Sequence, residues 1–182
     1  MPQWYPSRWP EFVYHFSEDP AIERFVPHVP PTNPGAGAHV WAIDGDHAPL
    51  YWFPRECPRV TVWARDAGER SQLESRFDTT SARVHWVEHG RLTTIAEAEL
   101  FVYELDAAPF APWAEAEGQW IADDEIVPRS VVPLGNCIDR HRAAGVDLRV
   151  VDDLWPHVDA VVACGLPFSI VRLRNARPRP VS

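Results

Sequence analysis

The sequence predicts an α+β fold for a single domain that spans residues 1–182. Three observations support this class. Hydrophobic residues make up 46% of the chain, which is enough for a folded core. Nineteen prolines are spread along the chain and favour many short elements over a helical bundle. The predicted helices lie between only some of the predicted strands, so a regular alternation of strand and helix is not expected.

Short runs of aromatic and β-branched residues predict the strands. In chain order they are residues 12–16, 39–43, 59–63, 100–105, 119–122, 126–127, 146–151 and 170–173. The segment 27–37 is rich in proline and glycine and is expected to connect the first two strands over the surface.

Apolar residues at helical spacing predict the helices. The predicted helices are residues 67–77, 83–98 and 134–144, with shorter helical segments at 19–25 and 46–53. Asp19 is a suitable cap and Pro20 a suitable first residue for the earliest of these. Gly145 is placed to end the last.

The charge of the chain favours a small-molecule or protein partner over nucleic acid. Seventeen basic residues, all of them arginine, stand against 26 acidic residues, for a net charge of −9. Nucleic-acid binders usually present a basic surface that neutralises phosphates, so nucleic acid is not an expected partner. A lysine Schiff base is excluded because the chain contains no lysine.

The sequence predicts a cytoplasmic protein with no membrane partner. The segment Met1–Pro6 lacks the basic region and the apolar stretch of a secretory signal. No apolar run approaches the roughly 20 residues that a membrane-spanning helix needs. The three cysteines, Cys57, Cys137 and Cys164, are far apart, which predicts reduced structural thiols instead of a zinc ribbon or a disulfide framework.

The run His85-Trp86-Val87-Glu88-His89 matches the pattern of inverted zinc peptidases. On a helix its two histidines would share one face, as metal ligands do. We interpret it instead as a surface helix with two unrelated histidines, and expect no metal; a small zinc hydrolase is the alternative. The sequence holds no nucleophile elbow, P-loop or dinucleotide-binding glycine motif.

Segment 14–27 begins Tyr-His-Phe-Ser-Glu-Asp-Pro, and segment 39–51 runs from His-Val-Trp-Ala-Ile-Asp to Ala-Pro-Leu-Tyr. Together they resemble the opening of ADP-ribosyltransferase-like domains of the His-Tyr-Glu class. The later segments 100–105, 119–122 and 171–175 add to the likeness, which spans most of the chain and is greatest to an uncharacterised bacterial group of short domains. The resemblance implies short strands in a split antiparallel or mixed sheet with a few flanking helices. It also implies NAD as the cofactor, used as a substrate.

The resemblance implies a cofactor-binding role for five residues. His15 matches the histidine that hydrogen-bonds the ribose of NAD. The backbone of Phe16, which Ser17 follows, would lie near the nicotinamide carboxamide. Tyr51 matches the aromatic residue that stacks on the nicotinamide ring, and Trp41 would supply an aromatic side chain on the second strand.

The resemblance also implies a catalytic acid before a late strand, where Asp124 and Glu125 stand. The residue type favours Glu125, and strict spacing favours Asp124. Such a carboxylate would stabilise the oxocarbenium-like centre that forms when the nicotinamide–ribose bond breaks, while His15 orients the ribose. Val40 and Ala48 depart from the family pattern, which expects an aromatic and a hydroxyl residue at these places.

Two functions therefore remain open. One is transfer of ADP-ribose to a protein or small acceptor, or cleavage of NAD. The other is a catalytically degenerate module that binds a nucleotide or a protein. His15 and Tyr51 are equally compatible with core packing, and Glu125 with a solvated turn.

Overall fold

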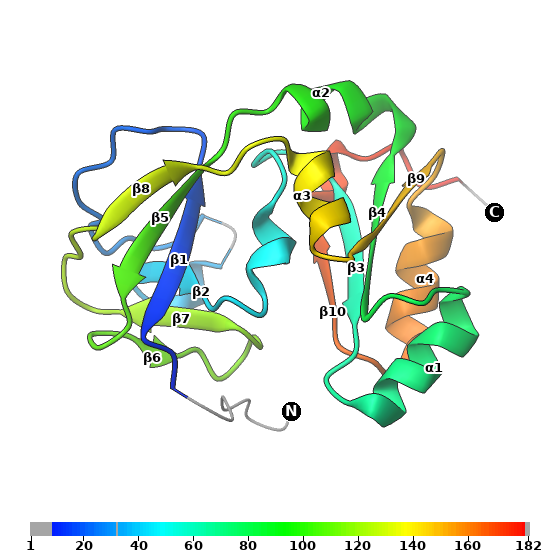
Figure 1. Cartoon of the computed structure of the whole chain (residues 1–182), viewed down its shortest axis with the longest axis horizontal. Helices are drawn as coiled ribbons and strands as arrows, with labels where there is room; N and C mark the ends of the chain where they lie inside the picture. The colour runs from blue at the N-terminus through cyan, green and yellow to red at the C-terminus, as the bar shows by residue number, and fades with distance from the viewer. Residues whose placement is uncertain (1–8, 32, 181–182) are drawn as a thin grey trace. The chain divides into compact units, whose positions relative to one another are not determined.

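The computed structural model describes residues 9–31 and 33–180, in which the chain forms two compact units (Figure 1). Unit 1 consists of Met1–Tyr51 and Leu100–Leu134, and unit 2 of Trp52–Glu99 and Gly135–Ser182. Each unit has its own sheet, and helices accompany the strands, which confirms the α+β class. The described residues include no helix with the length and apolar character needed to cross a membrane. The segment Met1–Pro6 lies outside the described residues.

Unit 1 contains a six-stranded sheet in the order β6-β7-β2-β1-β5-β8, and every neighbouring pair is antiparallel. Its strands are β1 (Phe12–Ser17), β2 (Val40–Ile43), β5 (Phe101–Asp106), β6 (Ala111–Pro112), β7 (Gln119–Ala122) and β8 (Ser130–Pro133). Two single-turn 3-10 helices, η1 (Pro34–Ala36) and η2 (Ala48–Tyr51), flank β2 in the sequence.

The two faces of this sheet differ in character. Side chains alternate between the faces of a strand, so the cross-strand pairs Val13–Leu105 and Ala42–Trp120 share one face. That face forms the core of unit 1, and its central residues are almost fully buried. The opposite face, here called the aromatic face, carries Tyr14, Phe16, Trp41, Ile43 and Gln119.

The two central strands of unit 1 meet over a very short length. β1 pairs with β5 along all six of its residues, from Phe12–Asp106 to Ser17–Phe101. It pairs with β2 only at Tyr14–Ile43. The sheet is therefore weakly joined between β1 and β2, beside the first strand on which the resemblance places the ribose-binding histidine.

Unit 2 contains a four-stranded sheet in the order β10-β3-β4-β9, with β4 and β9 parallel and the other pairs antiparallel. The strands are β3 (Arg59–Trp63), β4 (Arg83–Glu88), β9 (Asp147–Val151) and β10 (Phe168–Val171). The helices are α1 (Ala67–Phe77), α2 (Leu92–Glu97), α3 (Cys137–Ala143) and α4 (Trp155–Cys164), with 3-10 turns η3 (His89–Arg91) and η4 (Leu173–Asn175). In Figure 1, α1 and α4 lie on one face of this sheet and α3 on the other.

The helix predicted over residues 83–98 is wrong. Residues 83–88 form β4, and only Leu92–Glu97 form a helix, after η3. Val84 and Trp86 pack into the core with α1 and α4, while His85 and Val87 are buried on the other face. Because both faces are covered, successive positions of the strand are buried, and Val84 and Val87 fit helical spacing as well as a strand.

Two smaller predictions are corrected in the same way. Segment 19–25 forms no helical turn; the Asp19 carboxylate accepts the amide of Ala21, and Phe25 forms an isolated β-bridge with Ile126. Of segment 46–53, only the single turn η2 is helical.

Candidate functional site

The structure brings three of the predicted cofactor-binding residues to the aromatic face of unit 1. Tyr51, the last residue of η2, stacks on Phe16 with the ring centroids 6.2 Å apart and the ring planes inclined by 13°. The side-chain amide of Gln119 donates a hydrogen bond of 2.5 Å to the Tyr51 hydroxyl oxygen. Trp41 lies on the same face, on β2. The Tyr51 ring is thus fixed both at its face and at its hydroxyl.

The other two predicted cofactor-binding residues lie differently. His15 neighbours Phe16 on β1, so its side chain leaves the strand on the core side. Its ring centroid is 4.6 Å from that of Phe25, and its Nδ1 donates to the carbonyl oxygen of Trp41 at 2.9 Å. Ser17 ends the strand, where its hydroxyl oxygen accepts the amide of Asp19. The structure therefore places His15 and Tyr51 on opposite faces of the sheet.

The acidic turn follows β7 and is exposed. The carboxylate of Glu125 forms an ion pair of 2.5 Å with Arg24, and Asp124 beside it is exposed. Ile126 bonds to Phe25 through both backbone groups, at 2.8 and 2.9 Å. Because Phe25 contacts His15, the backbone that follows the acidic turn lies in the core-side neighbourhood of His15.

Trp41 belongs to a cluster of three aromatic rings. Its ring centroid lies 5.3 Å from that of Trp113 and 6.0 Å from that of His39. The imidazole of His39 is held by Asp123 at 2.7 Å. The indole Nε1 of Trp41 is buried and has no acceptor among the described residues. A buried donor without a partner is uncommon in folded proteins and marks a place where a ligand oxygen could bind.

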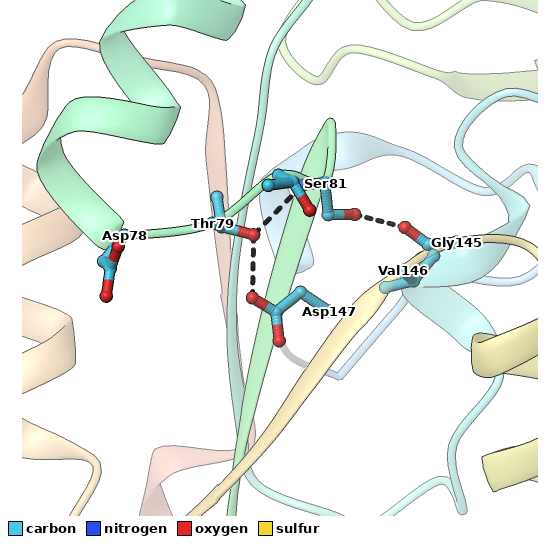
Figure 2. Close-up of a pocket in the computed structure, with 7 residues that line it drawn as sticks. Asp78, Thr79, Ser81, Gly145, Val146 and Asp147 are labelled. Carbon is cyan, nitrogen blue, oxygen red and sulfur yellow. Dashed lines mark hydrogen bonds between the residues drawn. The ribbon is translucent and has the colours of Figure 1, made fainter.

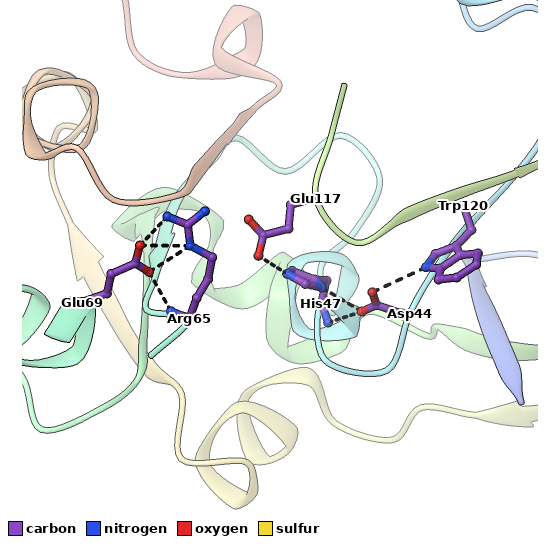
Figure 3. A network of polar contacts seen from close by, with 6 residues as sticks. All are labelled: Asp44, His47, Arg65, Glu69, Glu117 and Trp120. Carbon is purple, nitrogen blue, oxygen red and sulfur yellow. Dashed lines mark hydrogen bonds and ion pairs between the residues drawn. The ribbon is translucent and has the colours of Figure 1, made fainter. Parts of the chain in front are cut away.

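A buried polar network that the sequence did not predict lies in the loop after β2 (Figure 3). The His47 Nδ1 is 2.8 Å from Asp44 Oδ1, and its Nε2 is 3.2 Å from Glu117 Oε1. The indole of Trp120 reaches the second Asp44 oxygen at 3.5 Å. The spacing of Asp44 and His47 was a possible signal, but Glu117 is brought in by the pairing of β2 with β7.

Unit 2 contains a second histidine constellation. His85 does not share a helix face with His89, because it lies on β4 and is fully buried. Its Nδ1 is 3.1 Å from Nε2 of His141, whose Nδ1 donates to the carbonyl oxygen of Cys137 at 2.7 Å. Over residues 9–31 and 33–180, no three histidine, cysteine or acidic side chains are grouped as a metal centre requires.

The hydrogen positions in this pair follow from its contacts. A carbonyl oxygen only accepts, so His141 carries its proton on Nδ1 and accepts at Nε2 from Nδ1–H of His85. The His85 Nε2 is then a buried lone pair, and it has no partner in the described structure. Desolvation lowers the pKa of His85 well below its usual value, and lowers that of His141 as well.

The three cysteines are free and buried, as the sequence analysis expected of structural thiols. Burial raises the pKa of both Cys57 and Cys137 to about 11. Neither is a thiolate at neutral pH, so neither has the activation of a nucleophile.

A hollow of about 490 Å³ opens on unit 2 between the end of α1 and the start of β9 (Figure 2). It is lined by Asp78, Thr79, Thr80, Ser81, Gly145, Val146 and Asp147. The Thr79 hydroxyl donates to Asp147 at 2.7 Å, and the Ser81 hydroxyl donates to the carbonyl oxygen of Gly145. These hydrogen bonds join the two segments, so the hydroxyl groups of Thr79 and Ser81 already have partners within the unit.

Comparison with curated proteins and with solved structures gave no match. A family model described as a family of unknown function, DUF6886, matches residues 14–176. This match extends over both units and includes most of β1, η2, the acidic turn and the His85–His141 pair. The chain therefore belongs to the DUF6886 family.

Proposed function

We propose that unit 1 is an ADP-ribosyltransferase-like module that binds a nucleotide of the NAD type, with the nicotinamide ring against Tyr51. The observation that carries this proposal is the stacked pair of Phe16 and Tyr51, with the Tyr51 hydroxyl held by Gln119. A ring that is already oriented loses little conformational freedom when a planar ligand stacks on it.

The buried indole N–H of Trp41 supports the proposal independently. It lies on the same face of the sheet as Phe16 and lacks an acceptor among the described residues. Leaving such a donor unpaired costs about 1–3 kcal/mol, which a carboxamide or phosphate oxygen of the ligand would recover.

The contacts of the acidic turn favour a binding module over an enzyme that consumes NAD. In the catalytic form, Glu125 or Asp124 would stabilise positive charge on the ribose, and the ADP-ribose would pass to a protein or small acceptor. The Arg24 guanidinium lies 2.5 Å from the Glu125 carboxylate and offsets the negative charge that this step requires. Catalysis would need Glu125 to exchange Arg24 for the ribose.

Substitution of Tyr51 tests the binding proposal. Tyr51→Ala removes the stacking ring and should weaken NAD binding at least tenfold. Tyr51→Phe is the matched control: it keeps the ring and loses only the bond to Gln119, so its affinity should fall between those of the wild type and Tyr51→Ala. Isothermal titration of NAD into the three proteins measures this order. A wild-type chain that binds no NAD would overturn the proposal.

Analysis of the same samples for free nicotinamide separates the two forms of the proposal. Binding without release identifies the non-catalytic module. Release that disappears in Glu125→Gln while binding persists identifies an enzyme with Glu125 as its catalytic residue.

Replacement of Trp41 tests the unpaired donor. Trp41→Phe keeps an aromatic ring and removes the indole N–H, so NAD affinity should fall by about tenfold, the value of one good hydrogen bond. Thermal stability without NAD should not fall by the cost of a lost bond, because that N–H has no acceptor in the described structure. Equal NAD affinity in the variant and the wild type would show that the ligand does not use this donor.

A further inference from the structure

Tyr51 is carried by a loop that three successive residues of one neighbouring segment hold in place. Glu117 contacts His47, the carbonyl oxygen of Gly118 accepts the amide of Asp44 at 3.0 Å, and Gln119 donates to Tyr51. The loop is also closed on itself, since the amide of Leu50 donates to the carbonyl oxygen of His47 at 3.0 Å. The position of the Tyr51 ring therefore depends on how the loop sits against residues 117–119.

His47 is the centre of this attachment. Both of its ring nitrogens face carboxylate oxygens, and a carboxylate only accepts hydrogen bonds. The ring therefore bridges the carboxylates of Asp44 and Glu117. Asp44 Oδ1 also accepts the backbone amide of His47 at 2.9 Å. His47 is 7% exposed and Asp44 9%, so their contact is largely shielded from water.

The backbone of Gly118 is fitted to the same ring. A Cβ atom at this position would lie 2.3 Å from Cγ of His47 and 2.5 Å from its Cβ. Gly118 also has a φ of +80°, which side-chain-bearing residues rarely adopt. The imidazole ring thus packs directly on the main chain of the segment that bonds to Tyr51.

We infer that His47 is a positioning residue for the ligand of Tyr51: held between Asp44 and Glu117, it fixes the loop so that the Tyr51 ring faces the ligand in one orientation. The inference rests on the proposed function for its ligand, and on the contacts of unit 1 for its mechanism. It predicts that the effect of His47 on binding passes through Tyr51.

A double-mutant cycle on NAD affinity tests this coupling. His47→Gln should weaken NAD binding about tenfold when Tyr51 is present. In a Tyr51→Ala chain the same change should have little further effect, because there is no ring to orient. His28→Gln, an exposed histidine of the same unit, is the control and should leave affinity unchanged. Additive effects of His47→Gln and Tyr51→Ala would overturn the inference, since a general loss of structure would act equally in both backgrounds.

A second measurement does not depend on NAD. The chain has four tyrosines, so 3-fluorotyrosine labelling gives few ¹⁹F resonances, and the one missing from Tyr51→Phe belongs to Tyr51. In His47→Gln this resonance should shift or broaden while those of the other tyrosines stay in place. If His47→Gln does not fold, Glu117→Gln serves instead, because it removes one charge and keeps an acceptor oxygen. An unmoved Tyr51 resonance overturns the inference, whereas a moved one in a chain that binds no NAD refutes only the proposed ligand.

Discussion

Unit 2 should lose stability steeply as the pH falls below about 6.5, because its folded state cannot readily protonate the His85–His141 pair. Desolvation is the largest cause of the lowered pKa of His85, and the charged groups that add to it, His141, Arg83 and Arg59, are all basic. A proton added at Nε2 of His85 would also have no acceptor in the described structure.

The direction of the effect follows from proton linkage. The unfolded chain binds protons at these histidines with the ordinary pKa of 6.5, and the folded chain binds them only at lower pH. Stability is therefore complete above pH 6.5 and declines below it until the folded-state pKa values are reached. Each proton taken up on unfolding contributes a slope of about 1.4 kcal/mol per pH unit. The lowered pKa of His157 acts in the same direction.

Urea unfolding at a series of pH values measures this slope. In the double variant His85→Gln, His141→Gln, the slope of the unfolding free energy against pH should lose the contribution of these two histidines. This should hold whatever the stability of the variant at pH 7.5. His89→Gln changes an exposed histidine of the same unit and should keep the wild-type slope. If the double variant keeps it too, the buried pair is not the acid-sensitive element.

Gly118→Ala should destabilise unit 1 by about 2–5 kcal/mol. The new methyl group would overlap the His47 ring, and overpacking of this kind costs about 1–3 kcal/mol. The left-handed backbone at Gly118 adds about 1–2 kcal/mol for any residue with a Cβ.

Gly135→Ala is the matched comparison for this substitution. Gly135 has nearly the same φ, +82°, but a Cβ there would meet nothing within 4 Å. Gly135 belongs to unit 2, so Gly135→Ala should lower the unfolding free energy of that unit by the backbone contribution alone. The larger loss expected for unit 1 in Gly118→Ala then measures the contact with His47. Equal losses would show that the packing of His47 on Gly118 is unimportant.

The sequence predicted most elements whose signals are local. The helix at 67–77 and the strands at 59–63 and 119–122 have the predicted bounds, because each carries a clear pattern between polar or glycine-containing neighbours. The error at 83–98 arose because Val84, Val87, Leu92 and Ile95 recur at helical spacing, although they belong to a strand buried on both faces and to the separate helix α2.

Helix α4 was not predicted, although its residues carry the usual signals. Pro156 occupies its first turn and Gly165 follows its end with a φ of +78°. Its buried residues Val158 and Val161 recur at helical spacing, but within an almost entirely apolar run that has no polar face to reveal the period.

The site was predictable only in part, since its contacts join distant segments. The aromatic character of Phe16 and Tyr51 was readable from the sequence, but their stacking depends on where η2 sits over the sheet. His47 and Glu117 are 70 residues apart and meet because β2 pairs with β7. His85 and His141 meet only because α3 packs on the face of the unit 2 sheet from which the His85 side chain projects.

The division of each unit into two chain segments determines the order in which they can be completed during synthesis. β1 and β2 are made early, but β5, which pairs with β1 along its whole length, follows only after residues 52–99 have been synthesised. Unit 1 is complete once residue 134 has emerged. At that point β9, the parallel partner of β4, has not yet been synthesised, and neither has α4, which completes the core around Trp86. During this interval the strands β3 and β4 lack their later partners β10 and β9, which makes the nascent chain most prone to aggregation between residues 99 and 171.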